Sequence, residues 1–189
     1  MIDTRVRPHV TRYLDAIGRV LAKAGITPAM MTALGLALVL VGSIMVATGR
    51  LVSGAWVIAL GSALDGLDGA VARASGSVSP RGAFLDSAFD RIGEIAAFAG
   101  LAFAKEGEAR ILLLIVLAVG GSMLVPYMRA RAEAEGLVGT GGLMGRTERL
   151  IVFCAGLIFG VIEAMLWVYV VLVWLTAFTR FIRTYRSIT

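Results

Sequence analysis

Charged residues are scarce in this chain. They make up 16% of its 189 residues, whereas 58% are hydrophobic, and the mean hydropathy is +0.86. A soluble domain carries about a quarter charged residues. The uncharged stretches at 28–49 and 111–128 are about as long as a helix that crosses a bilayer. The composition therefore excludes a soluble globular domain and predicts an integral membrane protein.

Three other residue types are almost absent, and each absence limits the chemistry. The single cysteine, Cys154, excludes an intrachain disulfide, and its apolar surroundings predict an inert packed thiol. The single histidine, His9, lies in the basic N-terminal segment, where we expect a surface position. Lysine occurs twice, so nearly all of the positive charge is arginine. The N-terminus lacks a short apolar core with a small-residue cleavage site, so we expect no removable signal peptide.

The apolar stretches predict an all-α integral membrane protein with six transmembrane helices behind an N-terminal amphipathic helix. Residues 1–26 alternate basic and apolar positions, which predicts a helix lying on the cytoplasmic membrane surface. A solvated basic tail is the alternative. Residues 27–189 form the transmembrane domain, with spans at 28–48, 52–73, 82–104, 109–130, 147–164 and 166–185. The last division follows from Glu163, the single charge between 150 and 179.

Basic residues are distributed unevenly over this topology. Fourteen lie at the two termini and in the second-to-third and fourth-to-fifth connections, and three lie on the other side: Arg50, Lys105 and Arg110. The positive-inside rule places the richer side in the cytoplasm. We therefore expect a multi-pass protein of the cell membrane. The net charge of +5 fits attraction to anionic lipid or phosphorylated substrates, and we expect no nucleic-acid partner.

Four aspartates lie within or beside the predicted spans: Asp65, Asp68, Asp86 and Asp90. An ionised side chain at bilayer depth costs at least ~2.5–3.5 kcal/mol, so four acids close together require compensating cations. Asp65 and Asp68 are three residues apart, and Asp86 and Asp90 are four apart, so each pair shares a helix face. Two such faces, at the cytoplasmic end of the bundle, predict an all-oxygen site for Mg²⁺ or Mn²⁺, because no histidine or cysteine belongs to it. Two ions would offset the charge and suit an in-line phosphoryl displacement.

Small residues and one arginine accompany the acids. Gly69 and Gly82 remove side chains where a ligand must approach the backbone, and Ala72 keeps the next turn shallow. Arg73 offers a planar charged group suited to a diphosphate. Intramembrane acids also serve ion pathways, so a metal or proton transporter is the alternative function.

The whole pattern, D-x2-D-G-x2-A-R-x8-G-x3-D-x3-D, is matched at all eight fixed positions by residues 65–90. It resembles the signature of the CDP-alcohol phosphotransferase family. The resemblance implies an enzyme of phospholipid biosynthesis, usually a homodimer, in which an acceptor hydroxyl attacks the lipid-side phosphorus of a CDP-linked lipid and CMP leaves. The first span keeps the family's proline and threonine, Pro28 and Thr32, but not the asparagine that usually follows the proline.

The resemblance also implies roles for the matched residues. Asp65, Asp68 and Asp86 would hold the metals, and Asp90 would complete the cluster and serve as the candidate general base. The CDP portion would be bound by the remaining fixed positions, which are Gly69, Ala72, Arg73 and Gly82.

Arginines at three predicted helix ends outside the signature indicate the acceptor. Segments 127–133, 145–149 and 176–180 are similar to phosphatidylinositol-phosphate synthases, which implies that inositol phosphate is gripped by Arg129, Arg146 and Arg180. Arg129 stands where those enzymes usually have lysine, and Gly145 replaces a glutamate. Positive-inside topology is the other explanation for these arginines. The other acceptor is glycerol 3-phosphate, whose enzymes usually favour lysines in the later loops.

Overall fold

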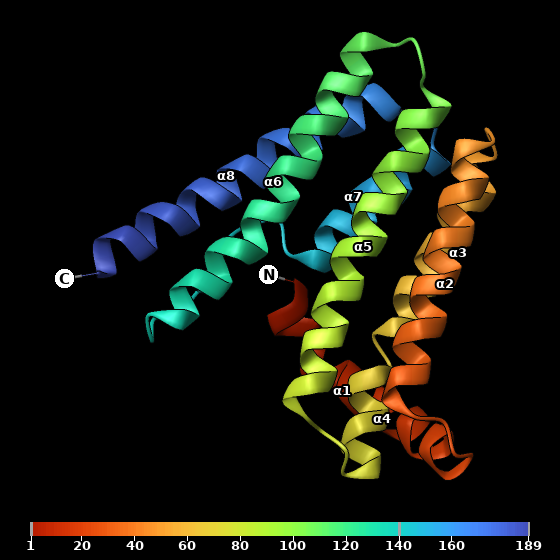
Figure 1. Ribbon diagram of the computed structural model, residues 1–189, viewed down its shortest axis with the longest axis vertical. Helices are drawn as coiled ribbons and strands as arrows, with labels where there is room; N and C mark the ends of the chain where they lie inside the picture. Colours follow the sequence, from red (N-terminus) through yellow and green to blue (C-terminus); the bar gives the residue numbers. More distant parts are fainter. Residues whose placement is uncertain (1, 140, 189) are drawn as a thin grey trace. The chain divides into compact units, whose positions relative to one another are not determined.

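The computed structural model describes residues 2–139 and 141–188, with side chains from residue 13 onward. These residues form eight α-helices and no strand, so the predicted all-α class is confirmed. The chain divides into two compact units, Ile2–Ala104 and the residues from Lys105 onward. Figure 1 shows the helices coloured along the chain. The side chains of residues 2–12, and with them His9, lie outside the described residues.

The first unit is built around one central helix, α2. Its helices are α1 (Ile2–Lys23), α2 (Pro28–Ala47), α3 (Leu51–Asp65), α4 (Asp68–Ser75) and α5 (Pro80–Ala104). α2 contacts α3, α4 and α5, and α1 contacts α4 (Figure 1). Thr27 caps α2, because the Met30 amide donates to its hydroxyl at 3.3 Å. Pro28 occupies the first turn, where a helix needs no N–H donor.

Glycines let α2 and α3 approach closely. A Cβ atom on Gly42 would lie 2.8 Å from the carbonyl oxygen of Gly54, and one on Gly61 would lie 2.7 Å from that of Gly35. Gly35 also faces the last residue of α3, since its Cβ would lie 2.7 Å from the Cβ of Asp65. Real Cβ atoms do not come this close to other heavy atoms. The backbone contact between α2 and α3 therefore sets the position of Asp65.

The helix through the signature is interrupted. α3 ends at Asp65 and α4 begins at Asp68, so residues 66–67 form a turn inside the predicted span 52–73. Between them, the Leu67 amide donates to the Leu64 carbonyl oxygen at 3.0 Å, which tightens the last turn of α3. The two acids consequently approach the site from two helices.

The second unit is held together by polar contacts along α8. Its helices are α6 (Ala109–Ala134), α7 (Arg146–Ile158) and α8 (Ile162–Ser187), and α8 contacts both others (Figure 1). A buried hydrogen bond of 2.8 Å joins the hydroxyls of Ser122 on α6 and Tyr169 on α8. The indole N–H of Trp174 donates to the Leu117 carbonyl oxygen at 2.9 Å. These bonds fix α6 against α8.

Among the described residues, four helical segments are long and apolar enough to cross a membrane: Pro28–Ala47, Leu51–Ser75, Ala109–Ala134 and Ile162–Ser187. They correspond to the first, second, fourth and sixth predicted spans, so the chain is a multi-pass membrane protein. α5 is long enough at 25 residues but carries five charged side chains, and α7 has 13 residues. The spans predicted at 82–104 and 147–164 stay predictions.

The boundary between α7 and α8 differs from the predicted one. α7 ends at Ile158, and Gly160 adopts a φ of +70°, a conformation that favours glycine. Glu163 therefore lies in the first turn of α8, where a negative charge is favourable. Its carboxylate pairs with Arg110 of α6 at 3.0 Å. Glu163, on which the predicted boundary between the fifth and sixth spans depends, therefore lies at the start of a helix and not between two spans.

Candidate functional site

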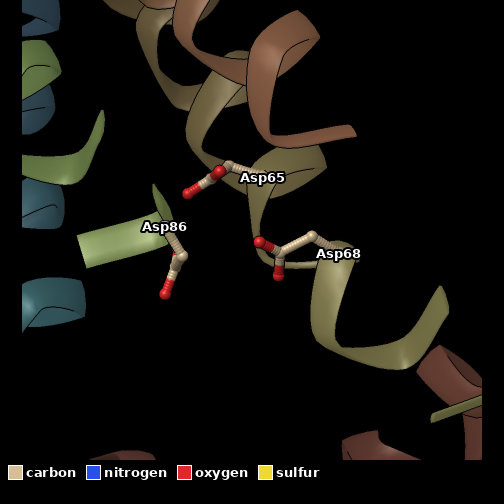
Figure 2. A group of neighbouring side chains, drawn as sticks. All are labelled: Asp65, Asp68 and Asp86. Atoms are coloured by element: carbon tan, nitrogen blue, oxygen red, sulfur yellow. The ribbon is translucent and has the colours of Figure 1, made fainter. Parts of the chain in front are cut away.

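Three of the four predicted metal ligands come together in the first unit. One carboxylate oxygen from each of Asp65, Asp68 and Asp86 lies within 4.8 Å of the other two, and we call these residues the acidic cluster. Figure 2 shows the side chains reaching one space from the end of α3, the start of α4 and α5. Asp65 is buried, and the other two are half-buried. Three separate helices therefore supply the cluster.

Two residues of α2 support the acidic cluster. The hydroxyl of Thr32, which is 3% exposed, lies 3.0 Å from Oδ2 of Asp68 and 3.0 Å from the carbonyl oxygen of Pro28, and it donates toward both. Gly35 lies directly against Asp65. The sequence identifies Thr32 only through the family pattern, and it gives no signal for Gly35. Both roles depend on how α2 packs.

The donor set of the acidic cluster suits a hard divalent cation. All three donors are carboxylate oxygens, which Mg²⁺ and Mn²⁺ prefer over the nitrogen and sulfur ligands typical of zinc. Two oxygens that bind one Mg²⁺ lie at most about 4.2 Å apart, because each is about 2.1 Å from the ion. The observed grouping within 4.8 Å needs little side-chain movement to meet that limit. The cluster therefore fits a divalent ion.

The fourth predicted ligand, Asp90, is not part of this group. It lies one turn beyond Asp86 on α5, and its side chain is 9% exposed. Its Oδ2 lies 3.4 Å from Nη2 of Arg91, which also pairs with Glu94 at 3.1 Å. Asp90 thus has a cation from its own helix as a neighbour.

Gly69 and Gly82 are not required by the packing of the protein itself. Both lie within helices and have ordinary negative φ angles. A Cβ on Gly69 would meet Nη1 of Arg73 at 3.5 Å, and one on Gly82 would meet the Ser79 hydroxyl at 3.4 Å, which are ordinary contacts. Alanine is favoured over glycine by about 1 kcal/mol in a helix interior. The difference is smaller in the first turn, where both glycines lie, but each glycine still costs some stability. The space that they leave is available to a ligand.

Arg73 reaches from α4 to the N-terminal helix. Its Nη2 and Nε lie 2.7 and 3.3 Å from Oδ1 of Asp15 on α1, and both side chains are partly exposed. Gly18 of α1 packs against α4, since its Cβ would lie 2.6 Å from the carbonyl carbon of Ala70. Ala72 is half-buried on α4. The N-terminal helix therefore contacts the helix that carries the signature's arginine.

A group of arginines gathers in the second unit. Arg180 on α8 and Arg149 on α7 donate to the connection between α6 and α7, at the carbonyl oxygens of Gly141 (2.8 Å) and Met144 (3.3 Å). Arg180 also donates to the Val125 carbonyl oxygen of α6 at 2.7 Å, and Arg129 lies one turn further along that helix. We call these three arginines the arginine cluster. Arg149 is 3% exposed, Arg180 is half-buried, and Arg129 is exposed and donates to Glu133 at 2.7 Å. Guanidinium groups held together in this way can bind a phosphate.

Two of the three arginines predicted for the acceptor phosphate, Arg129 and Arg180, belong to this cluster. The third, Arg146, is the first residue of α7 and is exposed. The sequence prediction omits Arg149, which is buried three residues further along α7. Its spacing from Arg146 places both on one helix face, but the sequence does not set Arg149 apart from the other arginines, whereas its burial does.

Comparisons with known proteins agree with these features. The model of the family described as CDP-alcohol phosphatidyltransferase matches residues 25–182. The chain is 34% identical over 181 residues to the archaetidylinositol phosphate synthase of Pyrococcus horikoshii, covering 94% of this chain and 93% of that protein. It is 36% identical over 157 residues to a phosphatidylinositol phosphate synthase of Mycobacteroides abscessus, covering 81% and 71%.

Solved structures share the fold. The crystal structure of Mycobacterium tuberculosis phosphatidylinositol phosphate synthase with CDP-DAG bound has a TM-score of 0.84 and 31% identity, over 92% of this chain and 94% of that one. The structure of the same enzyme with manganese and citrate also has a TM-score of 0.84 and 31% identity, over 91% and 88%. The family match includes the whole aspartate signature. The chain therefore belongs to the CDP-alcohol phosphatidyltransferase family.

Proposed function

We propose that the protein transfers the substituted phosphate group of a CDP-linked lipid to a hydroxyl of inositol phosphate and releases CMP. Membership of the family supports the transfer, and the names of the relatives support the acceptor. The observation that carries the acceptor assignment is the arginine cluster, because a neutral alcohol needs no group of cations. Membership of this enzyme family also argues against a metal or proton transporter.

The reaction exchanges one phosphorus–oxygen bond for another. The acceptor hydroxyl oxygen attacks the lipid-side phosphorus, the bond from that phosphorus to the bridging oxygen breaks, and CMP leaves with that oxygen. The hydroxyl proton passes to a base. We assign this role to Asp90, because it lies one turn from Asp86 but outside the acidic cluster. A carboxylate that binds a divalent ion directly is a weaker base than one beside the metal site.

The protein is a metal-dependent enzyme, and its acidic cluster would hold the metal. We propose two divalent ions, Mg²⁺ or Mn²⁺, with Asp65, Asp68 and Asp86 as ligands; a structural relative was crystallised with manganese. Such ions polarise phosphoryl oxygens and offset the charge that develops in the displacement. The chain contributes the positions of the carboxylates, which Thr32 and Gly35 maintain.

The CDP portion of the donor would occupy the space beside Gly69 and Gly82. Neither position needs a glycine for internal packing, so an approaching ligand explains why both lack a side chain. The guanidinium of Arg73 is partly exposed and suits a diphosphate, and Ala72 keeps the same turn small. A relative crystallised with CDP-DAG supports the donor class.

The membrane arrangement remains part of the proposal. We propose six spans, with α5 and α7 completing the four apolar segments, and a cytoplasmic site as the distribution of basic residues predicts. The N-terminal region 1–26 would lie in the membrane interface and precede the transmembrane domain 27–189. Exposed Tyr13, Ile17 and Val20 give α1 an apolar face for this role. A homodimer is proposed from the family resemblance.

A matched pair of arginines tests the acceptor site. Arg129 pairs with Glu133 at 2.7 Å, and Arg131 pairs with Glu135 at 2.8 Å on the same helix, and all four side chains are about half exposed. We expect Arg129→Ala to raise the KM for inositol phosphate at least ~10-fold, a loss of about 1.4 kcal/mol, without changing the KM for the CDP-lipid. Arg131→Ala should leave both values near those of the parent enzyme. If the two substitutions have equal effects on the KM for inositol phosphate, Arg129 has no specific role in acceptor binding, and both arginines serve only membrane topology.

A further inference from the structure

Thr176 lies inside α8 and connects it to the segment that precedes α7. The side chain is buried, with 1% of the residue exposed. Its hydroxyl oxygen accepts hydrogen bonds from the amides of Met144, at 3.0 Å, and Leu143, at 3.2 Å, and donates to the Leu172 carbonyl oxygen at 2.8 Å. A hydroxyl has one donor and two acceptor sites. All of its hydrogen-bonding capacity is therefore used, two-thirds of it on the connection between α6 and α7.

That connection follows a path that only glycine adopts readily. Gly141 and Gly142 have φ angles of +117° and +103°. A Cβ on Gly142 would collide with Cγ2 of Thr176, so the backbone runs in direct contact with α8. Arg180, one turn beyond Thr176, donates from Nε to the Gly141 carbonyl oxygen at 2.8 Å. Two residues on one face of α8 thus bind the same connection.

The same connection also reaches the arginines of α7. The buried Met144 accepts a hydrogen bond on its carbonyl oxygen from Nη1 of Arg149 at 3.3 Å. Arg146 begins α7 two residues later. Arg180 also donates from Nη1 to the Val125 carbonyl oxygen of α6 at 2.7 Å. The positions of Arg146, Arg149 and Arg180 are consequently coupled to the Gly141–Met144 segment.

We propose that Thr176 is a positioning residue for the acceptor phosphate, acting through the Gly141–Met144 segment on the arginines that would bind it. This inference rests on the proposed function. If the hydroxyl is removed, the amides of Leu143 and Met144 lose their acceptor in a buried setting, and the segment must move to find another. Arg149 and Arg180 then lose the fixed carbonyl oxygens that orient them. Acceptor binding weakens, whereas donor binding does not depend on this segment.

The test compares Thr176→Val with Thr176→Ser in the purified full-length enzyme. Valine keeps the shape of threonine and removes the hydroxyl, and serine keeps the hydroxyl. We expect Thr176→Val to raise the KM for inositol phosphate roughly tenfold or more and to leave the KM for CDP-diacylglycerol unchanged. Thr176→Ser should restore acceptor binding. The dissociation constant of inositol phosphate, measured by calorimetry without donor, should follow the same order.

Ser122→Ala is the matched control. It removes a buried hydroxyl hydrogen bond between α6 and α8, the one between Ser122 and Tyr169, and leaves the Gly141–Met144 segment intact. It should lower the Tm without changing either KM. The inference is overturned if Thr176→Val leaves acceptor binding unchanged, if both KM values rise together, or if Ser122→Ala reproduces the effect. If Thr176→Val does not fold, Thr176→Ala is judged by the same comparison.

The arginine pair separates this inference from the function on which it rests. If Arg129→Ala raises the acceptor KM and Thr176→Val does not, the role of Thr176 is rejected and the phosphate site stands. If Arg129→Ala is also without effect, the phosphate site itself fails.

Discussion

The substitution Gly69→Ala tests whether this glycine makes room for a ligand or is required for packing within the protein. The nearest atom to the added Cβ is Nη1 of Arg73 at 3.5 Å, the far end of a flexible side chain. The protein itself therefore has room for the methyl group. We expect the substitution to stabilise the fold while it weakens binding of the donor, two effects of opposite sign.

The magnitudes follow from the helical position of Gly69 within α4. Alanine gains about 1 kcal/mol over glycine in a helix interior and less in the first turn, where Gly69 lies. The rise in Tm is therefore at most about 2–4 °C for a chain of this size. A methyl group where the donor approaches the backbone displaces it by a fraction of an ångström to ~1 Å, and misplacement of this size reduces turnover up to ~100-fold. The KM for CDP-diacylglycerol should rise with it.

Gly120→Ala in α6 is the control. This glycine is also helical, and its Cβ would meet no atom closer than Cζ2 of Trp174 at 3.8 Å. Thermal unfolding in detergent and CMP release are measured for both variants. Both should gain stability, and only Gly69→Ala should lose donor binding. A Gly69→Ala enzyme with an unchanged KM for the donor would refute the argument that a ligand uses this space.

Three further substitutions test the acidic cluster and its neighbour. In Gly35→Ala, the new Cβ must move from 2.7 Å to at least 3.4 Å from the Cβ of Asp65, a movement of about 0.7 Å. The metal concentration for half-maximal CMP release should therefore rise, and excess metal should restore part of the rate. Thr32→Val removes the hydrogen bond to Oδ2 of Asp68, worth about 1.5–3 kcal/mol when the acceptor is charged, and a metal titration should show weaker binding, whereas unchanged affinity would remove its supporting role. Asp90→Asn should bind the CDP-lipid normally in a calorimetric assay but lose turnover, and a near-normal rate would end its assignment as the base.

The sequence was sufficient for features that depend on local pattern. Apolar stretches of span length predicted the four candidate membrane segments, because burial in lipid demands them regardless of how helices pack. The intervals between Asp65, Asp68 and Asp86 predicted one metal site, and the three carboxylates do come together. Spacing succeeded here because these acids lie close together along the chain.

Features that depend on packing could not be predicted in this way. The turn between α3 and α4 is made by backbone hydrogen bonds within a stretch whose side chains are compatible with a continuous helix. The supporting role of Gly35 appears only when α2 lies against Asp65. Arg149 is distinguished from the other arginines by its burial, which its sequence position does not reveal. Glu163 lies in the first turn of α8 and does not end the fifth predicted span, because a charge can either interrupt a span or begin a helix.

The most direct test of the account is the choice of acceptor. Purified protein is incubated in detergent with CDP-diacylglycerol and Mg²⁺, and CMP release and the mass of the lipid product are measured with inositol phosphate, glycerol 3-phosphate, serine or free inositol. The account predicts CMP release and a phosphatidylinositol phosphate product with inositol phosphate alone. Release with glycerol 3-phosphate but not with inositol phosphate would contradict the acceptor assignment, and release with free inositol at the same rate would contradict the role of the arginine cluster.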